Sequence, residues 1–218
     1  MKLPLLTLMG WLLSAPLAFA QSAPNPAPRH STLLDVSGAL GAQRGYGAAS
    51  AWRLWGLTGS DRFQAGIGAR ATVFFLPEQL YEGQTEPRDN SLRVLATRPV
   101  AFNAALHLRA RVAGPVRVGF NIDLVGFTVG DEPLSRQFAP MDVTVGTGFA
   151  QPVRANVLLG GRRDRGSLNS DFYVSADVSP KLNAHAGFSH VVNAYELNGQ
   201  RFQRFANLVS LGLMYRLR

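Results

Sequence analysis

Apolar and polar residues alternate with a period of two along several long segments of this chain. From Phe102 to Val112 every even-numbered residue is apolar, whereas the odd-numbered positions include Asn103, Arg109 and Arg111. The same alternation recurs in three further segments, 64–75, 116–124 and 172–178. A period of two predicts β-strands that have one apolar and one polar face.

Short turns join these segments into hairpins. These turns are compact and rich in Gly, Ser and Pro, and they cover Gly59 to Arg62, Ala113 to Pro115 and Ser179 to Lys181. Together with a first and a last strand, the pattern predicts eight strands, over 32–43, 52–58, 64–75, 102–112, 116–124, 172–178, 182–195 and 206–218. An even number of antiparallel strands brings both ends of the sheet to the same side.

The connections at the opposite ends of the strands are predicted to be longer. They cover residues 44–49, 76–100, 130–170 and 196–205. Such alternation between short turns and long loops is typical of bacterial membrane barrels, whose long loops face outward. A soluble barrel would also show hairpins, but its apolar face would point inward to a ligand. We therefore predict an all-β fold over residues 32–218, an eight-stranded antiparallel up-and-down transmembrane β-barrel.

The N-terminus has the features of an export signal. Lys2 precedes an apolar stretch to about Leu17, and Ala18-Phe19-Ala20 follows with small residues at the cleavage spacing. We predict a signal peptide over 1–20, a flexible leader over 21–31 and a location in the bacterial outer membrane. After Ala20 no apolar run reaches about 18 residues, the length that a membrane-spanning helix needs.

The last strand carries a family resemblance. Gly212, Tyr215 and Leu217 stand at the spacing of the C-terminal β-signal by which outer-membrane barrels are recognised for insertion, although Leu217 replaces the usual aromatic residue and Arg218 follows it. Residues 166–179 and 187–196 are similar to stretches of small outer-membrane barrels from Bacteroidota. The resemblance to this porin-like family implies that the barrel-assembly machinery is a partner during insertion.

If the apolar faces point to lipid, the polar faces form an internal network. An eight-stranded barrel has an interior only wide enough for side chains, and a buried unpaired charge is costly. The acids are therefore expected to pair with the more numerous bases. The predicted network consists of Asp35, Arg53, Arg70, His107, Arg109, Arg111, Arg117, Asp123, Asp177, His185 and Arg216.

Aromatic residues near the strand ends predict interfacial belts, in which amphipathic rings lie at headgroup level. The alternative for each residue is ordinary packing. The predicted belt residues are Trp52, Trp55, Phe63, Phe74, Phe75, Phe172, Tyr195 and Tyr215.

Composition limits the chemistry that the chain can carry. Cysteine is absent, which excludes disulfides and thiolate metal sites. The formal net charge of +8 is scattered along the chain without forming a stripe or tail, so we expect no nucleic-acid partner. The four histidines stand far apart without carboxylates at ligand spacing, and no phosphate-binding loop is present. We expect neither a metal nor a cofactor.

Two surface features suggest weaker hypotheses. Arg162, Arg163 and Arg165 form a basic cluster in the longest loop, which either grips lipopolysaccharide phosphates or is a solvated loop face. The stretch from His190 to Asn193 resembles the His-x-Ser-Asn motif of outer-membrane lipid A deacylases, in which the Ser is the nucleophile and the His the base. Val192 stands in place of that Ser, and the neighbouring Ser189 should face away from His190 because strand residues alternate.

Three functions are compatible with these patterns. The favoured one is a non-enzymatic outer-membrane barrel with a plugged polar lumen, whose long loops contact lipopolysaccharide or other surface molecules; its ligand is unknown. The second is a narrow channel for small anions or apolar molecules, suggested by the surplus of inward arginines. The third is an enzyme that modifies lipid A in the outer leaflet, suggested by His190 and Asn193.

Overall fold

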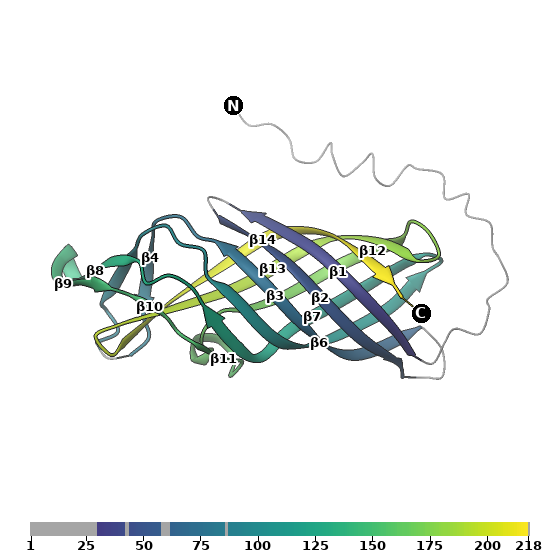
Figure 1. Cartoon of the computed structure of the whole chain (residues 1–218), viewed down its shortest axis with the longest axis horizontal. Helices are drawn as coiled ribbons and strands as arrows, with labels where there is room; N and C mark the ends of the chain where they lie inside the picture. The colour runs from purple at the N-terminus through teal and green to yellow at the C-terminus, as the bar shows by residue number, and fades with distance from the viewer. Residues whose placement is uncertain (1–29, 42–43, 58–61, 86, 218) are drawn as a thin grey trace, which may run out of the picture.

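Eight long strands close into an antiparallel barrel (Figure 1). The structure is a computed structural model that describes residues 30–41, 44–57, 62–85 and 87–217. The barrel strands are β1 (His30–Gly41), β2 (Arg44–Gly56), β3 (Phe63–Phe75), β6 (Val100–Ala113), β7 (Val116–Val129), β12 (Leu168–Asp177), β13 (Leu182–Leu197) and β14 (Gln200–Arg216). The predicted fold class is confirmed. The proposed signal peptide and nearly all of the leader lie outside the described residues.

The seam between the first and last strands closes the ring. β1 pairs with β14 from Leu33 opposite Arg216 to Leu40 opposite Val209, and β14 pairs with β13 along its other edge. Every barrel strand therefore has two hydrogen-bonded neighbours, so the barrel has no free edge at membrane depth. Two leader residues, His30 and Ser31, are part of β1, so the strand begins earlier than the pattern predicted.

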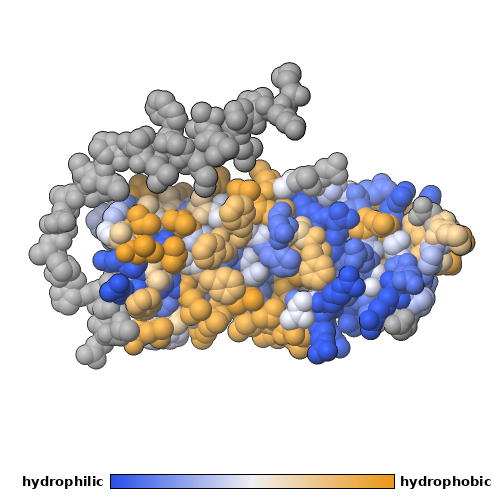
Figure 2. Space-filling view, turned by 180° about the vertical axis from the view of Figure 1, so that it is seen from behind, coloured by the Kyte–Doolittle hydropathy of each residue, from blue (hydrophilic) through white to orange (hydrophobic). Residues whose placement is uncertain are grey.

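The faces of the strands have the predicted polarity. Along β6 and β7 the predicted polar faces are buried, whereas large apolar residues such as Phe102, Leu108 and Leu124 are exposed. Apolar side chains cover the outer wall of the barrel, and polar ones gather toward the end with the long connections (Figure 2). A polar interior inside an apolar wall is the architecture of transmembrane β-barrels.

Two of the four predicted long loops are strands. Residues 44–49 belong to β2, because Gly45 and its small neighbours allow close strand approach: a Cβ at Gly45 would lie 2.7 Å from the carbonyl oxygen of Ala39. Residues 196–205 belong to β13 and β14, which meet at Asn198 and Gly199 with φ of 53° and 76°. Two successive positive φ values at Asn-Gly make a tight hairpin turn.

The two remaining long connections form four strands that extend the sheet beyond the barrel. These strands are β4 (Gln79–Gly83), β5 (Ser91–Val94), β8 (Leu134–Ala139) and β9 (Val143–Phe149), with a short 3-10 turn, η1 (Pro140–Asp142), between the last two. β4 adds to the edge of β14 at Phe202 and Gln203, and β5, β8 and β9 follow in order. We call these four strands the distal sheet, because they lie at the end opposite the C-terminus (Figure 1).

Two short strands tie the longest connection to the barrel. β10 (Gln151–Pro152) pairs with β13, and β11 (Ala155–Val157) pairs with β7, while η2 (Gly161–Arg163) is a 3-10 turn between β11 and β12. This connection therefore returns along the barrel mouth before it enters β12. Within the described residues no helix is long and apolar enough to cross a membrane.

Candidate functional site

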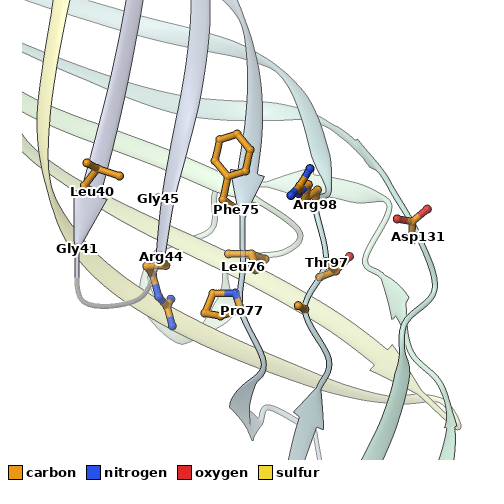
Figure 3. Close-up of a pocket in the computed structure, with 11 residues that line it drawn as sticks. Leu40, Gly41, Arg44, Gly45, Phe75, Leu76, Pro77, Thr97, Arg98 and Asp131 are labelled. Carbon is orange, nitrogen blue, oxygen red and sulfur yellow. The ribbon is translucent and has the colours of Figure 1, made fainter.

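Two regions of the barrel are candidates for a functional site: a groove on its outer wall and a network of polar side chains in its interior. The groove has a volume of about 690 Å³ and lies where β1, β2 and β3 end at the distal side (Figure 3). It is lined by Leu40, Gly41, Arg44, Gly45, Phe75, Leu76, Pro77, Ala96, Thr97, Arg98 and Asp131.

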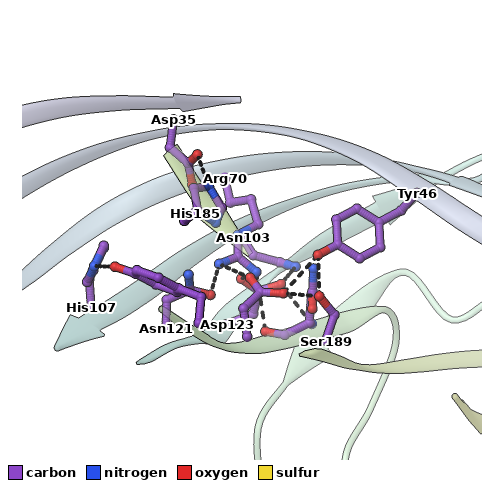
Figure 4. A network of polar contacts seen from close by, with 12 residues as sticks. Asp35, Tyr46, Arg70, Asn103, His107, Asn121, Asp123, His185 and Ser189 are labelled. Atoms are coloured by element: carbon purple, nitrogen blue, oxygen red, sulfur yellow. Dashed lines mark hydrogen bonds and ion pairs between the residues drawn. The ribbon is translucent and has the colours of Figure 1, made fainter. Parts of the chain in front are cut away.

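Arg70 of β3 is the centre of the interior network (Figure 4). Its guanidinium group lies 3.4 Å from Asp123 of β7 and 3.1 Å from Asp171 of β12, and it also hydrogen-bonds Asn121. The Arg70 side chain is 2% exposed and Asp123 is fully buried. Because an isolated ion in such surroundings is very costly, one base shared between two acids keeps these charges compensated.

Asp171 links Arg70 to the opposite wall of the barrel. The hydroxyl of Tyr46 in β2 donates to Asp171 over 2.8 Å and lies 2.6 Å from the hydroxyl of Ser189 in β13, which also bonds Asp171. These contacts cross the interior from β2 to β12 and β13. Sequence reasoning missed Asp171 and Tyr46, although the alternation in 172–178, extended by one residue, places Asp171 on the inner face.

A layer of amides extends the network to the barrel mouth. Asn103 of β6 donates to Asp123 over 2.7 Å and accepts a hydrogen bond of the same length from Asn156 of β11. Asn156 accepts from the Thr128 hydroxyl over 2.8 Å and from the backbone N–H of Ser167 over 2.9 Å. The longest connection is thus bonded into the interior. No sequence pattern marked Asn156, because it lies in a segment without alternation.

A second group of polar contacts lies nearer the short turns. His185 of β13 is 3.0 Å from Asp35 of β1, and His107 of β6 is 2.5 Å from the hydroxyl of Tyr173. Toward the short turns, Arg109 donates to Gln64 over 2.8 and 3.2 Å, and Arg117 pairs with Asp177 at 2.5 Å. Arg111 and Arg216 are half-buried at this end.

One predicted member of the network is on the wrong face. Arg53 is exposed on the outer wall and donates to the Thr32 hydroxyl over 3.0 Å, whereas its neighbours Trp52 and Leu54 are buried inside. The prediction for Arg53 is wrong because, near the short turn that follows β2, the larger apolar residues Trp52 and Leu54 point into the barrel. The alternation of apolar residues is therefore reversed in this part of β2.

Apolar clusters fill the interior on both sides of the network. Toward the distal sheet, buried residues from barrel and loops form one cluster, which includes Phe74, Tyr81, Tyr195 and Phe202. Toward the short turns lies a smaller one formed by Leu33, Trp52, Leu54, Ala105, Tyr173 and Met214. The predicted interior was polar throughout, so these two clusters are a correction.

The clusters also correct the predicted aromatic belts. Trp52, Phe74 and Tyr195 are each about 1% exposed and pack inside. These rings gain more from packing in the interior than from a place at an interface. The other five predicted belt residues, Trp55, Phe63, Phe75, Phe172 and Tyr215, are exposed on the outer wall.

Tyr81 anchors the distal sheet on the larger cluster. Burial, and secondly the neighbouring Tyr195, raise the pKa of the Tyr81 hydroxyl. The two rings meet edge to face with centroids 5.2 Å apart. The Tyr81 hydroxyl accepts a 3.0 Å hydrogen bond from the Gln79 side chain.

The deacylase-like stretch is divided between the two faces of β13. His190 is exposed on the outer wall, where its Nδ1 lies 2.8 Å from the Asn207 side-chain oxygen and its ring stacks on Phe205. Ser189 and Asn193 are buried inside. A hydroxyl nucleophile and its base must lie on one side, and the structure separates them. Nor does the described part of the chain contain three His, Cys, Asp or Glu residues grouped to hold a metal ion.

The basic cluster lies on the surface around η2. Arg162, Arg163 and Arg165 are exposed, and Arg162 makes a solvent-exposed ion pair with Glu82 of β4 at 3.7 Å. Asp164 between them is buried and accepts hydrogen bonds from the backbone N–H groups of residues 159 and 160. The cluster therefore alternates outward arginines with an inward acid.

The predicted insertion-signal residues lie at the seam between β14 and β1. Tyr215 and Leu217 are exposed on the outer wall, whereas Gly212 faces the interior. A Cβ at Gly212 would lie 2.2 Å from Nε2 of His185. Gly212 thus makes the room in which His185 reaches Asp35.

These features define a polar-cored, eight-stranded membrane-type barrel, and comparisons with known proteins give a remote likeness only. No protein-family model matches the sequence, and no curated protein matches it. Among solved structures, the chain is similar to Neisserial surface protein A, with a TM-score of 0.42 and 10% identity over 86% of this chain and 97% of that one. It is also similar to the CymD monoaromatic hydrocarbon channel, with a TM-score of 0.30 and 10% identity over 85% and 70% of the two chains. At these values neither likeness bears on function.

Proposed function

We propose that this protein is a non-enzymatic outer-membrane barrel that presents the distal sheet to the cell exterior. Its membrane location is supported by the inverted polarity of the barrel, since large apolar side chains cover the outer wall and the charges lie inside. The orientation follows from the connections. The short turns and the C-terminus lie at one end and the distal sheet at the other, and outer-membrane barrels place short turns in the periplasm.

The observation that carries a surface role is the distal sheet itself. A barrel needs no strands beyond the membrane, yet four strands are added to the edge of β14 and anchored by Tyr81 and Leu92. The outer face of this sheet exposes apolar and basic side chains side by side, with Arg93 directly opposite Arg136 across the β5–β8 pair. Exposed apolar residues rimmed by polar ones are typical of interaction sites.

The same packing argues against the two alternative functions. A channel would need a continuous polar path, whereas the two apolar clusters lie on either side of the Arg70 network. An enzyme of the deacylase type would need Ser189 and His190 on one face. Silence of the refolded protein in planar-bilayer recordings, and unchanged lipid A masses upon expression, are the results expected under this proposal.

Site-specific photocrosslinking in intact cells tests the surface role. A photoreactive residue in place of Arg136 or Thr147, on the outer face of the distal sheet, should yield a discrete crosslinked species. The same residue in place of Val174, which is exposed on the barrel wall, serves as the matched control and should crosslink lipid alone. If the distal sheet gives no product beyond that control, the proposed surface contact is wrong.

A further inference from the structure

The groove on the outer wall exists because β1 and β2 are short at the distal end. Their hairpin ends at Gly41 and Arg44, whereas β3 continues into Leu76 and Pro77 and the chain returns through Thr97 and Arg98. β14 rises past this step, since it pairs with β1 only up to Val209 and next meets β4 at Gln203. The step leaves a hollow open to the side of the barrel (Figure 3).

Two arginines that line this hollow, and a third that interacts with one of them, have no acidic partner. Within the described part of the chain, Arg44, Arg98 and Arg204 form no ion pair, although Asp131 lines the far end of the groove. The positive charges of Arg204 and Arg44 repel each other. One guanidinium nitrogen of Arg44, Nη1, is also buried without a hydrogen-bond partner. An anion in the groove would offset the repulsion between the two guanidinium groups.

The arginine side chains are held by neutral contacts. Arg44 donates to the side-chain oxygen of Gln79, and Arg204 donates to the backbone carbonyl of Leu80 over 2.6 Å. Arg98 lies over the Phe75 ring at 5.8 Å. Positioned guanidinium groups lose less conformational freedom when they bind a ligand than free ones do.

The floor of the groove is apolar. Leu40 and Phe75 are 75% and 46% exposed, and Leu76 and Pro77 line the groove beside them. Leu40 continues the outward row of Val36 and Leu34 on β1, which belongs to the apolar belt. The groove therefore spans the boundary between the belt and the polar end, which is the depth at which lipid headgroups lie.

We propose that this groove binds a phosphorylated lipid of the outer leaflet, lipid A, with a phosphate at Arg44 and Arg98 and acyl chains along Leu40 and Phe75. The proposal rests on the outer-membrane location and orientation proposed above. Guanidinium groups form paired, charge-assisted hydrogen bonds with phosphate. The proposed phosphate site is therefore the groove, which has an apolar floor. It is not the cluster at Arg162, which is solvated and partly neutralised by Glu82.

Native mass spectrometry of the refolded full-length protein in detergent tests this site. Lipid A, enzymatically dephosphorylated lipid A and phosphatidylglycerol are titrated separately. We expect lipid A to bind, and the double variant Arg44→Gln/Arg98→Gln to weaken it by about tenfold or more, since charge-assisted bonds are lost. The control Arg162→Gln/Arg163→Gln removes the same charge and should change binding by less than about twofold.

Other outcomes overturn the proposal. Equal binding of dephosphorylated lipid A would show that no phosphate is recognised, and stronger binding of phosphatidylglycerol would contradict an outer-leaflet ligand. Equal loss in both double variants would indicate attraction by net charge alone. Heat-modifiable migration on a gel verifies that each variant is folded. Absence of lipid binding in a protein whose distal sheet still crosslinks on cells would refute the groove alone, whereas absence from the outer membrane would refute both proposals.

Discussion

At the scale of single residues, the charges at the centre of the interior are compensated because one base is shared between two acids. Arg70 compensates Asp123 and Asp171 together, the Asn103 amide donates to Asp123, and the side-chain oxygen of Asn121 accepts a hydrogen bond from Arg70. Without a base, two buried carboxylates would lie close to each other with nothing to neutralise them. The importance of this arginine thus follows from its burial and not from its charge, since Arg53 carries the same charge on the outer wall.

Replacement of Arg70 tests this difference. Arg70→Met should lower the free energy of unfolding by about 3–5 kcal/mol, because removal of one partner leaves buried charges uncompensated. Arg53→Met, the matched control, should change it by less than about 0.5 kcal/mol. Urea unfolding of the refolded protein in detergent, followed by tryptophan fluorescence, measures both. Similar losses in the two variants would mean that the network contributes no more than a surface charge.

Gly212 has two possible roles, and a double-mutant cycle separates them. If Gly212 only makes room for His185, Gly212→Ala should cost about 1–3 kcal/mol of unfolding free energy in the natural chain, a typical price of overpacking. In the His185→Ala background the same change should then cost almost nothing. If instead Gly212 acts through recognition at insertion, the cost in vitro should be small in both backgrounds and assembly in cells should fail.

At the scale of elements, the sequence predicted strands well and their ends poorly. The faces of β3, β6, β7 and β12 are as the alternation predicts, because lipid and a packed interior both impose the period of two. The ends of β2 and β13 differ from the predicted bounds because glycine-rich and Asn-Gly segments are typical both of loops and of closely approaching strands and tight turns. The short distal strands form two local hairpins, β4–β5 and β8–β9. The pairings that join these hairpins to each other and to β14 span long stretches of sequence, which no local pattern encodes.

The last strand offers a prediction about assembly. Tyr215→Ser should reduce the amount of folded protein in the outer membrane several-fold, because Tyr215 is an exposed residue of the β-signal that this strand resembles. Val174→Ser removes an apolar side chain of similar exposure from β12 and is the control. Heat-modifiable protein in outer-membrane fractions is the measurement. If both variants refold normally in detergent and lose outer-membrane assembly to the same extent, Tyr215 acts only as a lipid-facing residue.

At the scale of the whole molecule, the longest connection has two parts that pack against different regions. Residues 134–149 form β8 and β9, which pair only with β5 and with each other and touch no barrel strand through backbone pairing. Residues 154–167 include β11, which pairs with β7, and Asn156, which bonds the interior amide layer. The outer half therefore belongs to the distal sheet, whereas the inner half belongs to the barrel.

Two deletions of similar length distinguish these parts. Replacement of residues 134–149 by a short Gly-Ser linker should leave urea unfolding of the barrel nearly unchanged and abolish any surface contact of the distal sheet. Replacement of residues 154–166 should destabilise the barrel by at least 1–3 kcal/mol, roughly the cost of each buried polar group left without a partner, since Asn103 and Thr128 both lose Asn156. Equal destabilisation by the two deletions would contradict the division, because the distal sheet would then be part of the barrel's cooperative unit rather than an addition to it.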